Sequence, residues 1–141
     1  MISQSFRPVL FHGIGVTTLL LAILLLTGCG GASSTSAAEA GFHNYLAAVK
    51  TKRMSNIETY VSGWQHNKLL GTGAIRKIKM YVASLPQQIT VTEVKIKNES
   101  QAIVYVQGKH LDSGVIIKGQ FHMIFEGNIW KVNKEQWDQS D

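Results

Sequence analysis

The sequence is poor in the residues that cross-link a chain or mark a catalytic centre. Its 141 residues include a single cysteine, so no internal disulfide can form. No HExxH, CxxC, Walker-type glycine loop or GxSxG pattern occurs. The histidines do not show the spacing of a metal site: His12, His43, His66, His110 and His122. We therefore expect neither a metal nor a nucleophilic cysteine centre.

Charge is missing from the N-terminal part of the chain. No Asp, Glu, Lys or Arg lies between Val9 and Thr27, and the first acidic residue is Glu39. With 45% hydrophobic and 16% charged residues, the chain as a whole has a globular composition. Its length suits one domain with a targeting segment. The formal charge of +5 is modest and spread along the chain, so it favours anionic surfaces without indicating a nucleic-acid partner.

Residues 1–28 have the three parts of a secretory signal. Arg7 and the terminal amine make the first part positive, and a leucine-rich stretch follows over residues 14–26. Small residues, Thr27 and Gly28, then precede Cys29. We predict cleavage between Gly28 and Cys29. The alternative is a retained transmembrane helix, for which the apolar run is short.

The four residues Leu26-Thr27-Gly28-Cys29 resemble the lipobox of bacterial lipoproteins. The resemblance implies a diacylglyceryl group on the Cys29 thiol and a further acyl chain, such as palmitate, on its amine. Two or three acyl chains anchor a protein stably to a membrane. We expect no other cofactor. Because Gly30 stands where an Asp would imply inner-membrane retention, the resemblance places the protein at the outer membrane, facing the periplasm.

The rest of the chain divides into a tether and one domain. Residues 29–38 are small and polar, which predicts a flexible tether, and residues 39–141 form the domain. Ser36 and Glu39 fit a capping box for a first helix. A second helix is expected from Ser55 to about Trp64, and a third over residues 74–85. The apolar faces of these helices comprise Phe42, Tyr45, Leu46 and Val49, then Ile57, Tyr60, Val61 and Trp64, then Ile75, Ile78, Val82 and Leu85.

After Pro86 the hydrophobic period changes from helical to alternating. Strands are expected over residues 88–97, 101–109, 115–126 and 129–135, with a bulge near Thr92 and Glu93. Gly127-Asn128 predicts a tight hairpin. The connections are too short for crossovers, so the sheet should be antiparallel. The fold class is therefore α+β, with N-terminal helices packed against a curved antiparallel sheet.

From residue 39 to 137 the chain resembles small NTF2-like lipoproteins of the DUF4878 type. The resemblance rests on residues 42–49 (FHNYLAAV), on residues 57–62 (IETYVS) and on the closing hairpin, residues 121–132 (FHMIFEGNIWKV). It implies a cone-shaped roll with a pocket between sheet and helices. The chain departs from that pattern in the turn at residues 52–54 and over residues 64–70, where such proteins often have a short strand.

The aromatic and inward-facing positions supply the candidate residues for a pocket. We expect it to be lined by Tyr45, Trp64, Val104, Phe121 and Phe125, with His122 as the one candidate acid/base. The inward strand positions show no carboxylate, so we expect no buried ionisable group with a shifted pKa at its base. These aromatic residues could equally form the core.

The sequence favours a non-catalytic binding or scaffolding role at the cell envelope. The partners expected are membrane lipid through Cys29, an envelope protein or small ligand, and a second copy in a homodimer. The alternative is a small-ligand carrier or a ketosteroid-isomerase-like cavity enzyme of the same fold. A further reading, contact with anionic envelope polymers, rests on two basic groups: Lys50, Lys52 and Arg53, and Arg76, Lys77 and Lys79.

Replacing Cys29 by serine tests the anchoring hypothesis. Cys29→Ser removes the thiol that would carry the thioether, so the variant should remain unprocessed and unacylated. Mass spectrometry of the N-terminal peptide measures both properties. A wild-type peptide without lipid would refute the hypothesis.

Overall fold

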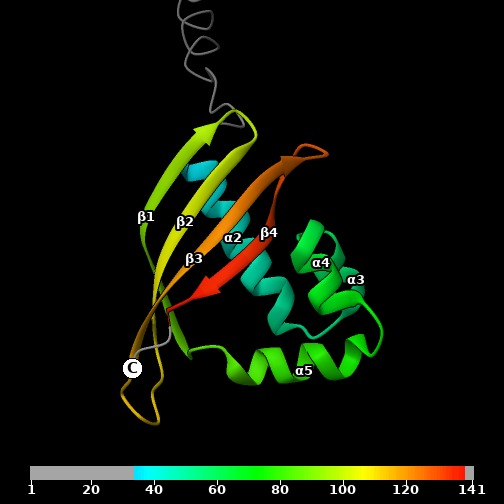
Figure 1. Cartoon of the computed structure of the whole chain (residues 1–141), viewed down its shortest axis with the longest axis vertical. Helices are drawn as coiled ribbons and strands as arrows, with labels where there is room; N and C mark the ends of the chain where they lie inside the picture. Colours follow the sequence, from blue (N-terminus) through cyan, green and yellow to red (C-terminus); the bar gives the residue numbers. More distant parts are fainter. Residues whose placement is uncertain (1–33, 139–141) are drawn as a thin grey trace, which may run out of the picture.

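The computed structural model describes residues 34–138 and gives an α+β fold in which helices precede a four-stranded sheet. The helices are α2 (Thr35–Lys50), α3 (Met54–Glu58), α4 (Gly63–Leu70) and α5 (Ala74–Ser84). The strands are β1 (Gln88–Asn98), β2 (Gln101–Lys109), β3 (Ile116–Glu126) and β4 (Ile129–Trp137). Figure 1 shows α2 running behind the sheet, α5 at its lower end and α3 and α4 beside β4. Within this part of the chain, no helix combines the length and the hydrophobicity needed to cross a membrane.

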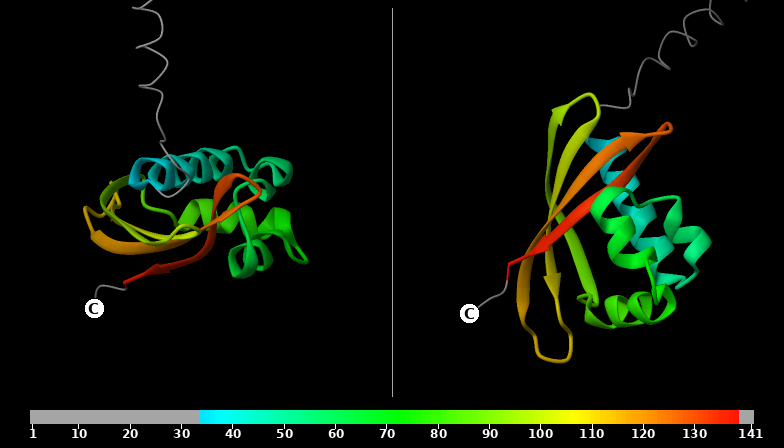
Figure 2. Two further views of the ribbon diagram at one scale, coloured as in Figure 1. Left: turned by 90° about the horizontal axis from the view of Figure 1, so that it is seen from above. Right: turned by 45° about the vertical axis from the view of Figure 1, so that its right-hand side comes forward.

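The sheet is an antiparallel meander with the order β1-β2-β3-β4, as the short connections predicted. A register shift between Val91 and Glu93 confirms the predicted bulge in β1. The hairpin between β3 and β4 turns at Gly127 and Asn128, both with positive φ (60° and 64°), as a tight primed turn requires. The sheet is twisted, and Figure 2 shows the helices on one side of it.

The core lies between α2 and the inward face of the sheet. Phe42 and Tyr45 of α2 are fully buried, and the ring of Phe42 lies 4.7 Å from that of Phe121 on β3. Gly41 allows α2 to approach β4, because a Cβ there would come within 2.4 Å of the Trp130 Cβ. The core residues and their packed neighbours run from Ala37 to Trp137. A chain that starts at Gly30 therefore retains all of this core.

The helical part differs from the sequence-based expectation at several points. Helix α2 begins at Thr35, with Ser34 as N-cap accepting a 3.1 Å hydrogen bond from the Ala37 amide, so the capping box at Ser36 was wrong. Residues 35–38, which we assigned to the tether, are helical. Tether residues 29–33 and the leader, including Gly28 and Cys29, lie outside the described residues.

The segment expected to form the second helix, from Ser55 to about Trp64, is divided between two helices, α3 and α4. Helix α3 ends at Glu58, and residues 60–62 form an isolated parallel bridge with β4 before α4 begins at Gly63. The Ser62 amide donates to the Val132 carbonyl at 3.0 Å, and the Val132 amide donates to the Tyr60 carbonyl at 2.9 Å. These long-range bonds interrupt a helical periodicity that local sequence supports. The capping box at Ser55 was also wrong, because α3 starts at Met54 without a side-chain cap.

Helix α5 matches its predicted range but is rotated relative to its predicted face. Ile78 and Leu85 are buried as expected, whereas Ile75 is 65% exposed. Tyr81, which we did not assign to the inner face, is 8% exposed. The rotation brings the Tyr81 hydroxyl under the sheet, where it enters the site described below.

Replacement of Trp130 should show how much of the stability resides between α2 and β4. Trp130 is 4% exposed and lies against Gly41 and Phe125. Trp130→Ala leaves a large cavity and should lower the free energy of unfolding by about 3–5 kcal/mol in a denaturant titration. Trp64→Ala, at a position that is 49% exposed, is the matched control and should cost less than about 1 kcal/mol. Equal losses for the two variants would contradict this account of the core.

Candidate ligand site

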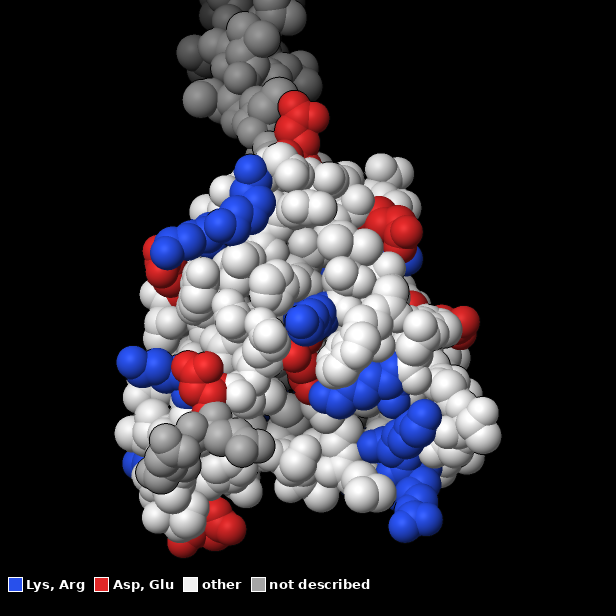
Figure 3. Space-filling model, in the orientation of Figure 1, with Lys and Arg blue, Asp and Glu red and all other residues white. Residues whose placement is uncertain are grey.

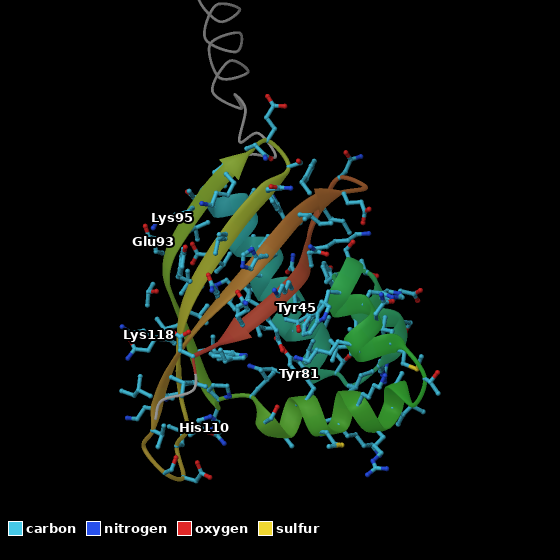
Figure 4. The ribbon with its side chains drawn as sticks, in the orientation of Figure 1. Tyr45, Tyr81, Glu93, Lys95, His110 and Lys118 are labelled. Atoms are coloured by element: carbon cyan, nitrogen blue, oxygen red, sulfur yellow. The ribbon has the colours of Figure 1, made fainter. Side chains whose placement is uncertain are left out.

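A chain of buried polar side chains connects three helices to β4. The Gln65 Nε2 atom on α4 donates to the Tyr45 hydroxyl on α2 at 2.7 Å, and that hydroxyl lies 2.8 Å from the Tyr81 hydroxyl on α5. Tyr81 in turn donates a short hydrogen bond to Glu135 Oε2 on β4. Figure 4 shows Tyr45 and Tyr81 close together, between the sheet and the helices. We call these residues, with Lys68, the Tyr–Glu network.

Lys68 completes the network at the carboxylate. Its Nζ atom on α4 forms a short ion pair with Glu135 Oε1 and lies 5.0 Å from the centre of the Tyr81 ring. The Glu135 side chain is 2% exposed and that of Lys68 is 37% exposed. A buried carboxylate requires such partners, because removing an unpaired charge from water is costly. Each carboxylate oxygen therefore has a partner within the fold.

A bulge in β4 turns Glu135 toward the helices. Val132 pairs with Met123 and faces the core, and strict alternation would then place Lys134 on the same face. The register shifts between His122 and Met123, so β4 has an extra residue and Glu135 pairs with Phe121 on the inward face. Lys134 is exposed and Glu135 is buried. Our expectation that no carboxylate lies on the inward face was wrong for this reason.

The hydrogen bonds of the network all run from donor to acceptor in the direction of Glu135. Tyr81 gives its only proton to Glu135, so Tyr45 must donate to Tyr81, and Tyr45 is then free to accept from Gln65. The Gln65 side chain is fully buried, and its Oε1 atom has no hydrogen-bond partner. The donated protons of the network thus all point toward Glu135.

Burial has a strong effect on the two phenols. It raises the pKa of Tyr45 above its ordinary value of 10.0, and the nearby Glu135 carboxylate adds to this effect. Burial likewise raises the pKa of Tyr81, with further contributions from Tyr45 and Glu135. Both hydroxyls are therefore neutral hydrogen-bond donors throughout the physiological range. The expectation of no ionisable group with a shifted pKa here was wrong.

The network borders a cavity of about 620 Å³ between α4, α5 and the ends of β3 and β4. This volume is in the range of small-molecule pockets. Its polar lining consists of Lys68, Lys77, Tyr81, Ser84 and Glu135. The rest of the wall is apolar: Leu69, Met80, Leu85, Pro86, Ile117 and Trp137.

Two glycines in the sheet shape this wall. A Cβ at Gly108 would lie 2.4 Å from the Pro86 Cγ, and one at Gly119 would lie 2.6 Å from the Trp137 Cε3. Without side chains at these positions, Pro86 and Trp137 rest directly on the strands. Trp137 also meets the edge of Phe121, with ring centres 5.5 Å apart. The apolar side of the cavity is therefore built on close-packed contacts.

The structure brings together three of the six residues that we predicted for the pocket, and it places them in the core. Tyr45, Val104 and Phe121 are fully buried in the core, and of these Tyr45 belongs to the network. Trp64 lies at the surface with Lys68 over its ring, and Phe125 packs against Trp130 at the other end of the sheet. His122 is half-buried on the face of β3 opposite Phe121 and pairs with Lys134 in the register. Within residues 34–138, no group of three or more His, Cys, Asp or Glu side chains could hold a metal ion.

Sequence reasoning missed Glu135, Tyr81, Gln65 and Lys68. A signal existed for Tyr81, which lies three residues after Ile78 and so shares its helix face. Lys68 and Gln65 are likewise three residues apart, in a segment to which we assigned no helix and which forms α4. No local signal marks the β4 bulge that turns Glu135 inward.

Comparison with known proteins gives no family for this chain. No protein-family model matches it, and no curated protein matches it.

The buried phenols predict a loss of stability at high pH. Below about pH 10 both tyrosines are neutral in the folded and unfolded states, so they do not make stability depend on pH. Above about pH 10 they ionise in the unfolded chain while the fold keeps them neutral, so the free energy of unfolding should fall as the pH rises. Denaturant titrations between pH 8 and pH 12 measure this slope. The double variant Tyr45→Phe/Tyr81→Phe should show a shallower fall, and an unchanged slope would contradict the assignment.

Proposed function

We propose that the chain is an envelope lipoprotein whose domain binds a small, largely apolar ligand in the cavity beside the Tyr–Glu network. The observation that carries this proposal is the cavity itself, a mostly apolar space of about 620 Å³ with a fixed polar group, Tyr81 and Glu135, at its wall. Binding sites for small molecules combine an apolar lining with a few oriented polar groups in this way. Of the readings left open by the sequence, the small-ligand carrier therefore has the most support.

The lipoprotein part of the proposal rests on the leader and the lipobox-like end at Cys29. It includes an outer-membrane location facing the periplasm. It also includes an NTF2-like roll, and the order of helices and antiparallel strands supports that part. The cavity lies at the α5 end of the domain, away from Ser34 at the start of α2, where the tether joins (Figure 1). A membrane at the tether would therefore leave the cavity accessible. Homodimers and a protein partner remain part of the scaffolding alternative.

A cavity enzyme of the ketosteroid-isomerase type is a second candidate. Glu135 and Tyr81 place a carboxylate and a neutral phenol beside an apolar space, and such enzymes use this pair of groups. However, the Glu135 side chain is 2% exposed and each of its oxygens already has a partner, Lys68 or Tyr81, so a substrate has little access to the carboxylate. This favours ligand binding over proton transfer.

Filling the cavity tests the binding proposal. Ile117 lines the cavity, whereas its neighbour Ile116 is 50% exposed. With the chain that starts at Gly30, the neutral apolar dye N-phenyl-1-naphthylamine should bind with enhanced fluorescence. Ile117→Trp should weaken this binding at least tenfold by occupying the space, and the control Ile116→Trp should leave it unchanged. Equal effects of the two variants, or no binding by the wild type, would refute the proposal.

A further inference from the structure

We infer that the cavity selects an amphipathic anion, a ligand with one negatively charged head and an alkyl-like tail, with Lys77 and Lys68 holding the head. This inference rests on the proposed function and adds the ligand's chemical class. The charged groups on the cavity wall are two ammonium groups, Lys68 and Lys77, and one carboxylate, Glu135.

The carboxylate does not offer its charge to a ligand. Glu135 is 2% exposed at its side chain, and its two oxygens are bound by Lys68 and Tyr81. A cationic ligand would meet two ammonium groups before it reached a carboxylate that is already neutralised. The electrostatics of the wall therefore oppose cations.

Lys77 supplies a positive charge that the fold does not use. It lies four residues before Tyr81 on α5 and so on the same face of that helix. Among residues 34–138, the ion pairs are those of His43, Lys68, Lys95 and Lys131, and Lys77 takes part in none of them. In Figure 3, basic side chains gather between the end of β4 and α5, around a patch of acidic atoms.

Lys68 can share the same head group. Its ammonium group has three protons and gives one to Glu135, and its side chain is 37% exposed. Lys68 therefore has protons left to donate to a carboxylate or similar head in the cavity, and Lys77, which also lines the cavity, attracts the same negative charge. Charge-assisted bonds of this kind are stronger than bonds between neutral groups.

The apolar part of the cavity wall can bind the alkyl-like tail of the ligand. Leu85, Ile117 and Trp137 lead away from the two lysines along an apolar surface, with Pro86 fixed beside them. A saturated chain buried there would gain free energy with each methylene removed from water. A ligand with an anionic head and one apolar tail is a single-chain amphiphile, such as a medium-chain carboxylate.

Competition between two ligands of equal length tests this inference. Decanoate and 1-decanol have the same number of carbons and differ in the charge of the head. On the chain that starts at Gly30, and below micelle-forming concentrations, each would displace N-phenyl-1-naphthylamine from the cavity. Decanoate should displace the dye at a concentration about fivefold to tenfold lower than 1-decanol.

Variants of α5 identify the charge responsible. Lys77→Gln should abolish most of the preference for decanoate without changing the affinity for 1-decanol, and Lys77→Arg should retain it. The matched control is Lys79→Gln, on the same helix but outside the cavity lining, which should behave as the wild type. Dye binding that Ile117→Trp blocks, with equal displacement by both ligands, would overturn the inference and leave the binding proposal standing. Absence of dye binding would instead refute the proposed function.

Discussion

The burial of one carboxylate, Glu135, constrains the positions of the helices around it. A charge this far from water needs oppositely charged and hydrogen-bonding partners at short range. Lys68 supplies the first from α4 and Tyr81 supplies the second from α5. Tyr45 extends the same network to α2. The network thus ties three helices to β4, and a shift of any of them would leave a buried polar group unpaired.

The domain has two ends with different packing. Toward Ser34, α2 approaches β4 closely enough that Gly41 has no room for a side chain against Trp130. Toward α5, a cavity of about 620 Å³ remains between that helix, α4 and the ends of β3 and β4. The space for the ligand that we propose therefore lies at the α5 end of the domain.

The charged groups of the network and those of the cavity wall have different roles. Glu135 is neutralised within the fold, so it positions Lys68 and Tyr81 without presenting its own charge to the cavity. Lys77 stands outside the network and belongs to the cavity alone. For this reason we propose a binding site for an anion, and not a centre for proton transfer, at a site that contains a carboxylate and two phenols.

The sequence by itself determined the features that depend on neighbours a few residues apart. The ranges of β2 and α5, the bulge after Val91 and the turn at Gly127 follow from alternation, helical period and turn chemistry, all of which are local. The leader and the lipobox-like end at Cys29 stay predictions from the sequence, because they lie outside the described residues. Tertiary structure decided the rest. The bridge between Val61 and Val132 divides the second helix, and the bulge in β4 reverses the faces of all residues after Val132. A strand's partner fixes such a bulge, and the partner lies outside any local window. Because the candidate site depends on that reversal at Glu135, only the assembled sheet could place it.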